Sequence, residues 1–142
     1  FIRDYDVSLP EFIVDREKLI QAILNIARNG AQAMKLNNQD NMQLSFITRA
    51  ERQIVFRKKK HATAIRIDIV DNGPGIKNEL IDKIFFPLVT GKENGSGLGL
   101  SLSQNLISLH QGMIDCHSVP GKTVFSIILP IENNLMPTKE KK

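Results

Sequence analysis

Three polar clusters occur in a fixed order in this chain, and that order limits what the chain can fold into more than any other feature. Asn25 and Asn29 lie in a stretch of helical periodicity, and Asp71 begins the run Asp-Asn-Gly-Pro-Gly-Ile. The third cluster, residues 95–100, reads Gly-Ser-Gly-Leu-Gly-Leu. Together they predict a nucleotide pocket, with amides for a metal ion, one carboxylate at a strand end and a glycine-rich phosphate loop.

The size and composition are those of one domain. The chain has 142 residues, of which 42% are hydrophobic and 24% are charged, so it can form one good core. We expect a domain over residues 1–131 and a disordered basic tail over 132–142. No apolar run approaches the ~18 residues of a membrane span, and no signal peptide opens the sequence, so we expect no membrane partner. The single Cys116 favours the reducing cytoplasm. Because the sequence begins at Phe1, we expect a fragment of a longer protein.

The net charge of +4 raises the possibility of nucleic-acid binding. Much of the excess lies in two runs, residues 57–60 and 139–142, and such runs are typical of solvated loops and tails. The chain has no Trp and one Tyr, and its basic and aromatic residues do not interleave as base stacking requires. Nucleic acid is therefore a weak alternative and not an expected partner.

Hydrophobic periodicity predicts an α+β fold. An amphipathic helix is expected over 16–34 with Asp15 as its N-cap, and a half-buried strand over 64–70, where apolar and polar residues alternate. The other expected elements are strands over 2–7, 43–48, 53–56, 113–118 and 123–129 and helices over 79–85 and 98–110. We expect 43–48 and 53–56 to pair as a hairpin, and 113–118 to pair with 123–129. The mixed order of elements predicts a two-layer sandwich, with helices on one face of a mixed sheet.

The first cluster has the chemistry of a magnesium site. Asn25 and Asn29 are four residues apart and share one helix face, and Gln32 lies three residues further along it. Carboxamide oxygens are hard ligands suited to Mg²⁺, which shares its remaining positions with water and phosphate. An exposed polar stripe is the alternative interpretation, and for an isolated pair of Asn residues it would be preferred.

The second cluster has the chemistry of an adenine site. The carboxylate of Asp71 can accept a hydrogen bond from an exocyclic amine, which adenine has at this edge and guanine lacks. Gly73 and Gly75 allow the backbone to approach a flat base closely. The alternative is a tight turn without further function, because Asp-Asn-Gly is common in turns.

The third cluster resembles a phosphate-binding loop. Gly95, Gly97 and Gly99 precede an amphipathic helix, so backbone amides and a helix N-terminus can face a phosphate. A Walker A loop is excluded, since position 86 is Phe where a Gly would be needed. A Rossmann fingerprint is excluded by Leu100, which stands where its third Gly would be. Glycine richness alone could also indicate only a flexible loop, but the placement of the glycines favours a phosphate site.

The order and spacing of the clusters resemble the N, G1 and G2 boxes of the histidine kinase catalytic domain, in the superfamily that includes gyrase, Hsp90 and MutL. The resemblance covers roughly residues 1–131 and implies a Bergerat-type sandwich that binds Mg²⁺ and ATP. Residues 85–92 resemble the F box and the lid over ATP, from which Lys92 could reach the phosphates. Thr123 matches a threonine near the adenine-binding Asp. The implied ATP-binding residues are Asn25, Asn29, Gln32, Asp71, Gly73, Gly75, Ile76, Lys92, Gly95, Gly97, Leu98, Gly99, Leu100 and Thr123.

The resemblance also separates a kinase from a hydrolase. Gyrase, Hsp90, MutL and serine-kinase relatives carry a Glu four residues before the metal-binding Asn, whereas this chain has Asn25, whose amide cannot act as a general base. Phosphoryl transfer needs mainly positioning and charge neutralisation. The resemblance implies that the acceptor histidine lies on a separate dimerisation domain, because His61, His110 and His117 lack its sequence context. A superfamily ATPase, a serine kinase and a non-catalytic nucleotide-sensing module are the alternatives.

A finer resemblance is to the nitrogen-regulation sensor kinases of the NtrB type. It rests on residues 3–10, on the run Asn25-Ile26-x-Arg28-Asn29 and on residues 86–92. It implies a soluble dimeric protein that phosphorylates the response regulator NtrC, and a PII signal protein that switches it toward phosphatase activity. The chain departs from the usual pattern at Gly30, where alanine is usual, and at Gln32, where many histidine kinases have Lys.

Overall fold

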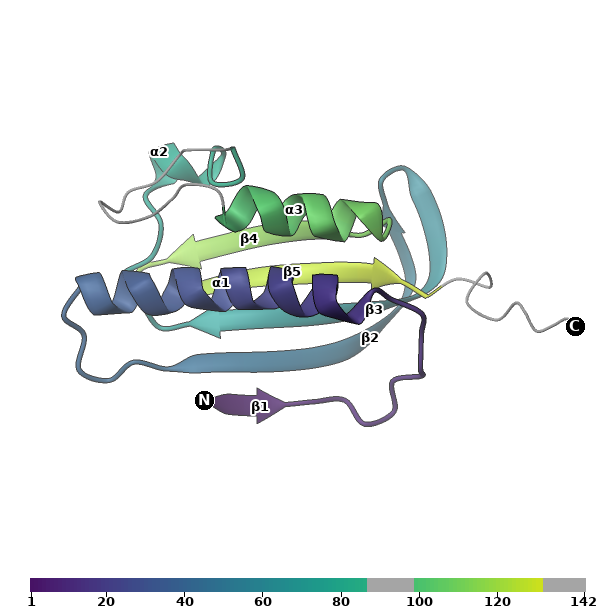
Figure 1. Ribbon diagram of the computed structural model, residues 1–142, viewed down its shortest axis with the longest axis horizontal. Helices are drawn as coiled ribbons and strands as arrows, with labels where there is room; N and C mark the ends of the chain where they lie inside the picture. Colours follow the sequence, from purple (N-terminus) through teal and green to yellow (C-terminus); the bar gives the residue numbers. More distant parts are fainter. Residues whose placement is uncertain (87–98, 132–142) are drawn as a thin grey trace, which may run out of the picture.

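The computed structural model describes residues 1–86 and 99–131, which form two layers: a five-stranded sheet and, on one of its faces, two long helices (Figure 1). The strands are ordered β1-β2-β3-β5-β4 across the sheet. The elements are β1 (Ile2–Asp4), α1 (Arg16–Leu36), β2 (Leu44–Phe56), β3 (Lys59–Asp71), α2 (Asn78–Ile81), α3 (Gly99–Leu109), β4 (Met113–Val119) and β5 (Lys122–Pro130).

The sheet is mixed, as predicted. β1 runs parallel to β2, while the β2–β3, β3–β5 and β4–β5 pairs are antiparallel. α1 and α3 lie side by side across the face of the sheet (Figure 1). The α+β sandwich expected from the sequence is therefore confirmed.

One predicted pairing is wrong. Residues 43–48 and 53–56 are not two strands of a hairpin but parts of one long strand, β2, which pairs along its length with β3. The chain reverses at Arg57 and Lys58, which both have left-handed backbone angles, with φ of 55° and 60°. Two-residue hairpin turns of this kind usually carry Asn or Gly, so two basic residues conceal the turn in the sequence. β1 and α2 are also shorter than predicted.

The core lies between the sheet and the helices. The alternating residues of β3 place Ile65, Ile67 and Ile69 on the helix-facing side, where all three are buried. They pack in one cluster with apolar residues of β5, α1 and α3, among them Phe125, Ile127, Leu129, Ile26, Met34 and Ile107. Burial of this apolar face is what holds the helices on the sheet.

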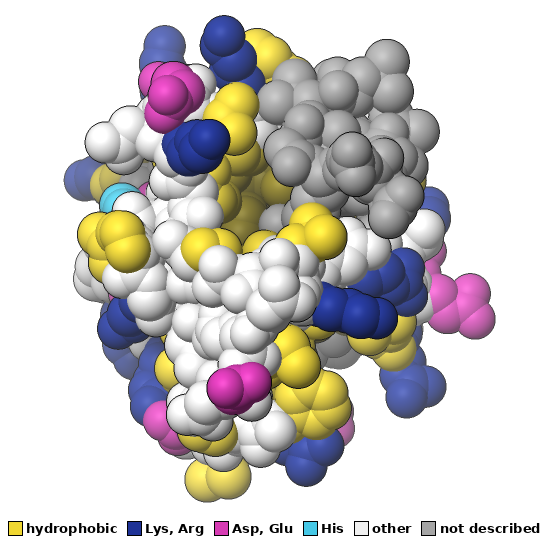
Figure 2. Space-filling view, turned by 90° about the vertical axis from the view of Figure 1, so that its left-hand side faces the viewer, with side chains coloured by type: hydrophobic (Ala, Val, Ile, Leu, Met, Phe, Trp, Pro, Cys, Tyr) yellow, Lys and Arg dark blue, Asp and Glu magenta, His cyan; other side chains and the backbone are white. Residues whose placement is uncertain are grey.

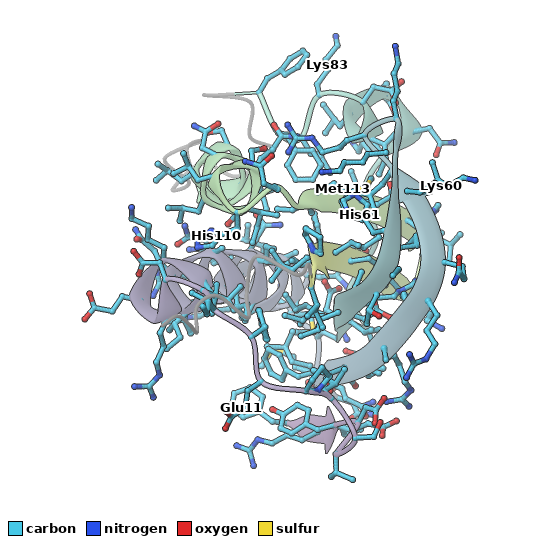
Figure 3. The ribbon with its side chains drawn as sticks, turned by 90° about the vertical axis from the view of Figure 1, so that its right-hand side faces the viewer. Glu11, Lys60, His61, Lys83, His110 and Met113 are labelled. Atoms are coloured by element: carbon cyan, nitrogen blue, oxygen red, sulfur yellow. The ribbon has the colours of Figure 1, made fainter. Side chains whose placement is uncertain are left out.

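The N-terminus of α1 is fixed by two side chains. Asp15 caps the helix, because its carboxylate Oδ1 accepts a hydrogen bond from the backbone N–H of Lys18 at 3.2 Å. Nε2 of His110 accepts the backbone N–H of Asp15 at 3.0 Å, so Nδ1 carries the proton and donates to the carbonyl of Leu106 at 2.9 Å. His110 lies between the ends of α3 and α1 (Figure 3). It therefore has a structural role.

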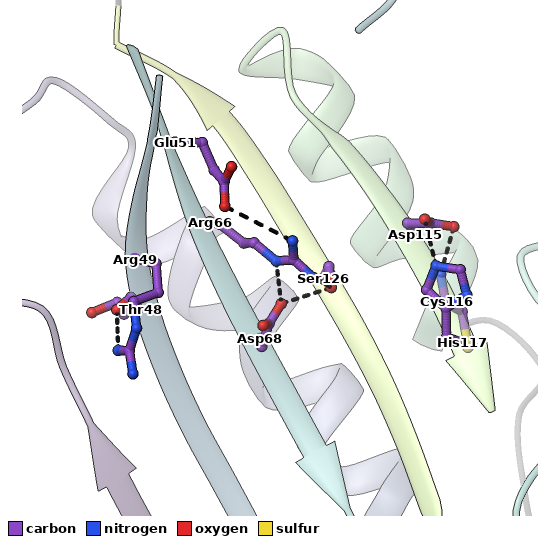
Figure 4. Close-up of polar contacts among 9 residues, drawn as sticks. All are labelled: Thr48, Arg49, Glu51, Arg66, Asp68, Asp115, Cys116, His117 and Ser126. Carbon is purple, nitrogen blue, oxygen red and sulfur yellow. Dashed lines mark hydrogen bonds and ion pairs between the residues drawn. The ribbon is translucent and has the colours of Figure 1, made fainter. Parts of the chain in front are cut away.

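The outer face of the sheet is polar. Arg66 of β3 contacts the carboxylates of Glu51 and Asp68, and Asp68 also accepts a hydrogen bond from the Ser126 hydroxyl at 2.6 Å (Figure 4). This network lies on the side of β3 opposite the core residues, as the alternating pattern requires. Within the described part of the chain, no helix is long and apolar enough to cross a membrane.

Candidate functional site

One end of the sandwich gathers several of the predicted site residues. Asp71 is the last residue of β3 and is only 7% exposed. Thr123 lies directly opposite it at the start of β5, and Leu44 lies opposite it on β2. The second half of α1 and the first turn of α3 lie over the same end (Figure 1). Figure 2 views this end and shows a hollow with hydrophobic side chains on its floor.

The carboxylate of Asp71 occupies space that two glycines leave open. A Cβ atom at Gly30 of α1 would lie 2.8 Å from Oδ2 of Asp71, and a Cβ atom at Gly73 would lie 2.9 Å from Oδ1. The backbone N–H of Gly73 also donates to Oδ1 at 2.9 Å. Gly30 therefore has a steric role that its low helix propensity does not reveal. This cradle fixes the carboxylate where a strand end, a helix and a turn meet.

The turn after Asp71 is held against the β4–β5 turn. The backbone N–H of Gly121 donates to the carbonyl of Gly73 at 2.9 Å, and the backbone N–H of Ile76 donates to the Ser118 hydroxyl at 2.8 Å. Gly75 has a φ of +91°, and a Cβ there would lie 2.9 Å from the Val119 carbonyl oxygen. Only glycine fits this position without strain. The backbone next to the carboxylate is consequently fixed on both sides.

Asn72 was not among the predicted site residues, and the structure gives it a structural role. Its side-chain oxygen accepts the backbone N–H of Gln43 at 2.8 Å and the Gln39 amide at 3.0 Å. Its side-chain nitrogen donates to the carbonyl of Asn41 at 2.8 Å. The residue thus ties the end of β3 to the loop between α1 and β2. The only sequence feature that indicates this role of Asn72 is its position directly after Asp71.

The helix residues of the first cluster lie on α1, as predicted. Asn25 and Asn29 are half-buried, whereas Gln32 is exposed. A Cβ atom at Gly99 would lie 4.0 Å from the Cβ of Asn25, so the first residue of α3 lies next to the middle of α1. Asn25 of the first cluster and Gly99, a described residue of the third, are therefore neighbours at one end of the sandwich.

The structure unites some of the predicted site residues and leaves others undescribed. Asp71, Gly73, Gly75, Ile76 and Thr123 lie together at the end of β3 and in the turns beside it, and Asn25 lies beside Gly99, the first residue of α3. Lys92, Gly95, Gly97 and Leu98 lie outside the described residues. Of the two F-box phenylalanines, Phe85 packs edge-on against Phe125 with ring centroids 6.2 Å apart, and Phe86 is 58% exposed.

Cys116 of β4 is a half-buried thiol near this site. Burial raises the pKa of Cys116 from 9.0 to about 12, and the negative charges of Asp115 and Asp71 add smaller contributions. Since the neutral thiol is favoured in the folded state, the unfolded chain loses this proton at lower pH than the folded chain. The stability that this difference contributes is fully present below pH 9 and is lost as pH rises toward 12.

We expect wild type to lose more stability than Cys116→Ala between pH 9 and 12, the interval between the two pKa values. The measurement is the free energy of unfolding from urea denaturation at several pH values. Tyr and Lys titrations are common to both proteins and cancel in the difference. Parallel curves for the two proteins would contradict the assignment.

Comparison with known proteins gives the family. Residues 14–133 match the family described as histidine kinase-, DNA gyrase B- and HSP90-like ATPase. A sensory histidine kinase/phosphatase NtrB of Vibrio alginolyticus is 50% identical over 129 residues, which cover 91% of this chain and 36% of the relative. An NtrB of Salmonella typhimurium is 46% identical over 130 residues, covering 92% of this chain and 36% of the relative. These relatives confirm the resemblance to NtrB-type kinases, and the chain spans about a third of their length.

A solved structure supports the same assignment. The nucleotide-free catalytic domain of histidine kinase ThkA aligns with a TM-score of 0.71 and 26% identity, covering 92% of this chain and 78% of that one. Its similarity confirms the Bergerat-type sandwich expected from the order of the three clusters. The matched residues include the cradle of Asp71, the helix with Asn25 and Asn29 and the start of α3. The chain therefore belongs to the histidine kinase-, DNA gyrase B- and HSP90-like ATPase family.

Proposed function

We propose that this chain is the ATP-binding part of a sensor histidine kinase, and that it directs the γ-phosphate of ATP to a histidine on a separate dimerisation domain. The observation that carries the proposal is the buried carboxylate of Asp71, held between Gly30 and Gly73 and opposite Thr123. The family match and the NtrB relatives support the same function.

Asp71 and Thr123 together would select adenine over guanine. A carboxylate next to a hydroxyl offers a hydrogen-bond acceptor beside a donor. Adenine carries the complementary pair, an exocyclic amine that donates and the ring nitrogen N1 that accepts. Guanine carries the reverse pair, a carbonyl oxygen and a ring N–H. The site therefore favours ATP over GTP.

The side-chain amides of α1 provide oxygen ligands for a metal ion. Asn25 and Asn29 would hold Mg²⁺ through their side-chain oxygens, with Gln32 near the same helix face. The ion supplies charge neutralisation for the phosphates. The residues at the start of α3, Gly99 and Leu100, add backbone amides at a helix N-terminus, which favour a phosphate. We include Lys92, Gly95, Gly97 and Leu98 in the proposed site on their sequence pattern alone.

The residue type at position 25 favours transfer of the γ-phosphate over hydrolysis of ATP. Asn25 stands where hydrolytic superfamily members carry Glu, and an amide cannot remove a proton from water. Among the described histidines, His110 uses both ring nitrogens in structural hydrogen bonds, and His61 is buried against Phe56 with ring centroids 4.2 Å apart. His117 is exposed on β4 but lacks the sequence context of an acceptor, so the acceptor histidine is expected on another domain.

The NtrB relatives extend the proposal to partners. We propose a dimerisation domain of the same full-length protein, an NtrC-like response regulator and a PII-type signal protein as partners, in nitrogen regulation. The support is that relatives 38–50% identical over most of this chain are NtrB sensory histidine kinase/phosphatases. The single cysteine agrees with a cytoplasmic location.

Calorimetric titration of the 142-residue chain with ATP and GTP, with and without Mg²⁺, tests nucleotide binding. We expect ATP to bind, GTP to bind at least ten-fold more weakly, and removal of Mg²⁺ to weaken ATP binding, because each missing charged contact costs about 1.5–3 kcal/mol. Equal affinity for ATP and GTP would contradict the role of Asp71. Absence of ATP binding would contradict the proposed function.

Phosphoryl transfer is tested by supplying a relative's dimerisation domain in trans and measuring phosphohistidine. The proposal expects acid-labile phosphate on that domain and only slow release of inorganic phosphate by the chain alone. Rapid steady-state phosphate release without an acceptor domain would favour an ATPase instead.

A further inference from the structure

Ser118 lies in the same row of side chains as Asp71, across three neighbouring strands. Ser118 of β4 pairs with Thr123 of β5, and Thr123 pairs with Asp71 of β3. Directly opposed residues point to the same face of a sheet, so the three side chains form one line toward the helices. The hydroxyl oxygens of Ser118 and Thr123 are 2.7 Å apart.

The direction of that hydrogen bond follows from the other partner of Ser118. Its oxygen already accepts the backbone N–H of Ile76 at 2.8 Å. Of the residues that the structure describes, Thr123 is the only acceptor within reach of the Ser118 proton. If Thr123 donated to Ser118 instead, the Ser118 proton would be left without a described acceptor on a half-buried side chain, which costs free energy.

We propose that Ser118 is a positioning residue that makes Thr123 a hydrogen-bond donor toward the nucleotide base. Because the Ser118 hydroxyl donates its hydrogen bond to the Thr123 oxygen, the Thr123 hydroxyl can direct its own proton into the site beside Asp71. Ser118 thereby fixes the order of acceptor and donor that matches adenine. This inference rests on the proposed function, since it concerns how the same site reads the base.

Ser118 can affect nucleotide binding in two ways, by directing the Thr123 proton or by supporting the local structure. Ser118 also holds the turn at Ile76, so its removal could loosen the site for every nucleotide. Without the Ser118 hydroxyl, the Thr123 proton is no longer directed toward the base, and this change affects only a base that has an acceptor at ring position 1. The analogue 1-deaza-ATP, in which N1 is replaced by C–H, keeps the exocyclic amine and the phosphates but lacks that acceptor.

The test measures dissociation constants of ATP and 1-deaza-ATP for the 142-residue chain and its variants by calorimetry. Ser118→Ala should weaken ATP binding about three- to ten-fold, the range of one net hydrogen bond, and should leave 1-deaza-ATP binding unchanged. Thr123→Val should show the same pattern, and the double variant should lose no more than Thr123→Val alone. Ser118→Thr, which keeps a hydroxyl, should bind ATP like wild type.

If the alanine variant does not fold, Ser118→Cys replaces it in the same test, because the thiol is similar in shape to the hydroxyl but a much weaker hydrogen-bond donor. The same loss for ATP and 1-deaza-ATP would overturn the proposal and leave Ser118 a structural residue. An unchanged affinity for ATP would also overturn it. Wild-type protein that fails to bind ATP would contradict the proposed function itself, so the two failures are distinguishable.

Discussion

Replacing Asp71 by Asn should reduce ATP affinity by at least 100-fold while the domain remains folded. The backbone N–H of Gly73 requires an acceptor at the Oδ1 position, so the amide nitrogen of Asn takes the other position, where a donor cannot pair with the donating amine of adenine. A lost charged hydrogen bond costs about 1.5–3 kcal/mol, and an unpaired buried amine on the base adds to the loss. The side chains are nearly the same size, so the cradle formed by Gly30 and Gly73 is kept. Calorimetric titration with ATP measures the change.

Asp68→Asn is the matched control, because Asp68 lies on the same strand but on the outer face of the sheet. It is bound to Arg66 and Ser126 and takes no part in the cradle (Figure 4). We expect this variant to bind ATP like wild type, with some loss of stability. Undiminished ATP affinity in Asp71→Asn, or the same loss in both variants, would contradict the assignment of Asp71.

The elements nearest to the site were predictable because each has a local cause. β3 alternates apolar and polar residues up to Asp71, and α1 begins at the Asp15 cap and buries one helical face. The turn between β4 and β5 is marked by Pro120 and Gly121, where a left-handed glycine is needed. Local propensity and tertiary packing agree at these positions, so the pattern was sufficient.

The parts that the sequence did not reveal depend on contacts between distant residues. β2 was divided in two because its polar middle resembles a turn, whereas the true turn at Arg57 and Lys58 has none of the usual turn residues. Gly30 in the middle of a helix indicated only a loss of helix propensity. Its contact with Asp71 depends on how α1 crosses the sheet. Ser118 has no motif of its own, and its importance follows from strand register.

A second large effect is expected from Gly112→Ala, which should destabilise the fold by about 3 kcal/mol or more. Gly112 joins α3 to β4, and a Cβ atom there would lie 2.5 Å from the backbone oxygen of Ile128. The same atom would lie 2.8 Å from a methyl group of Leu129 and 2.9 Å from one of Ile107. Because one neighbour is the backbone of a central strand, no side-chain rotation relieves the overlap. Urea denaturation measures the loss.

Gly121→Ala separates this steric cause from backbone conformation. Gly121 has a φ of +91°, but a Cβ atom there would meet nothing within 4 Å. Its replacement should cost only the ~1–2 kcal/mol of a left-handed alanine, without a clash. Since Gly112 lies at the far end of α3 from the site, the folded fraction of Gly112→Ala should bind ATP with unchanged affinity and reduced stoichiometry. Equal destabilisation of the two variants would show that packing against β5 does not dominate at Gly112, and weakened affinity in the folded fraction would show that α3 transmits the disturbance to its N-terminus beside Asn25.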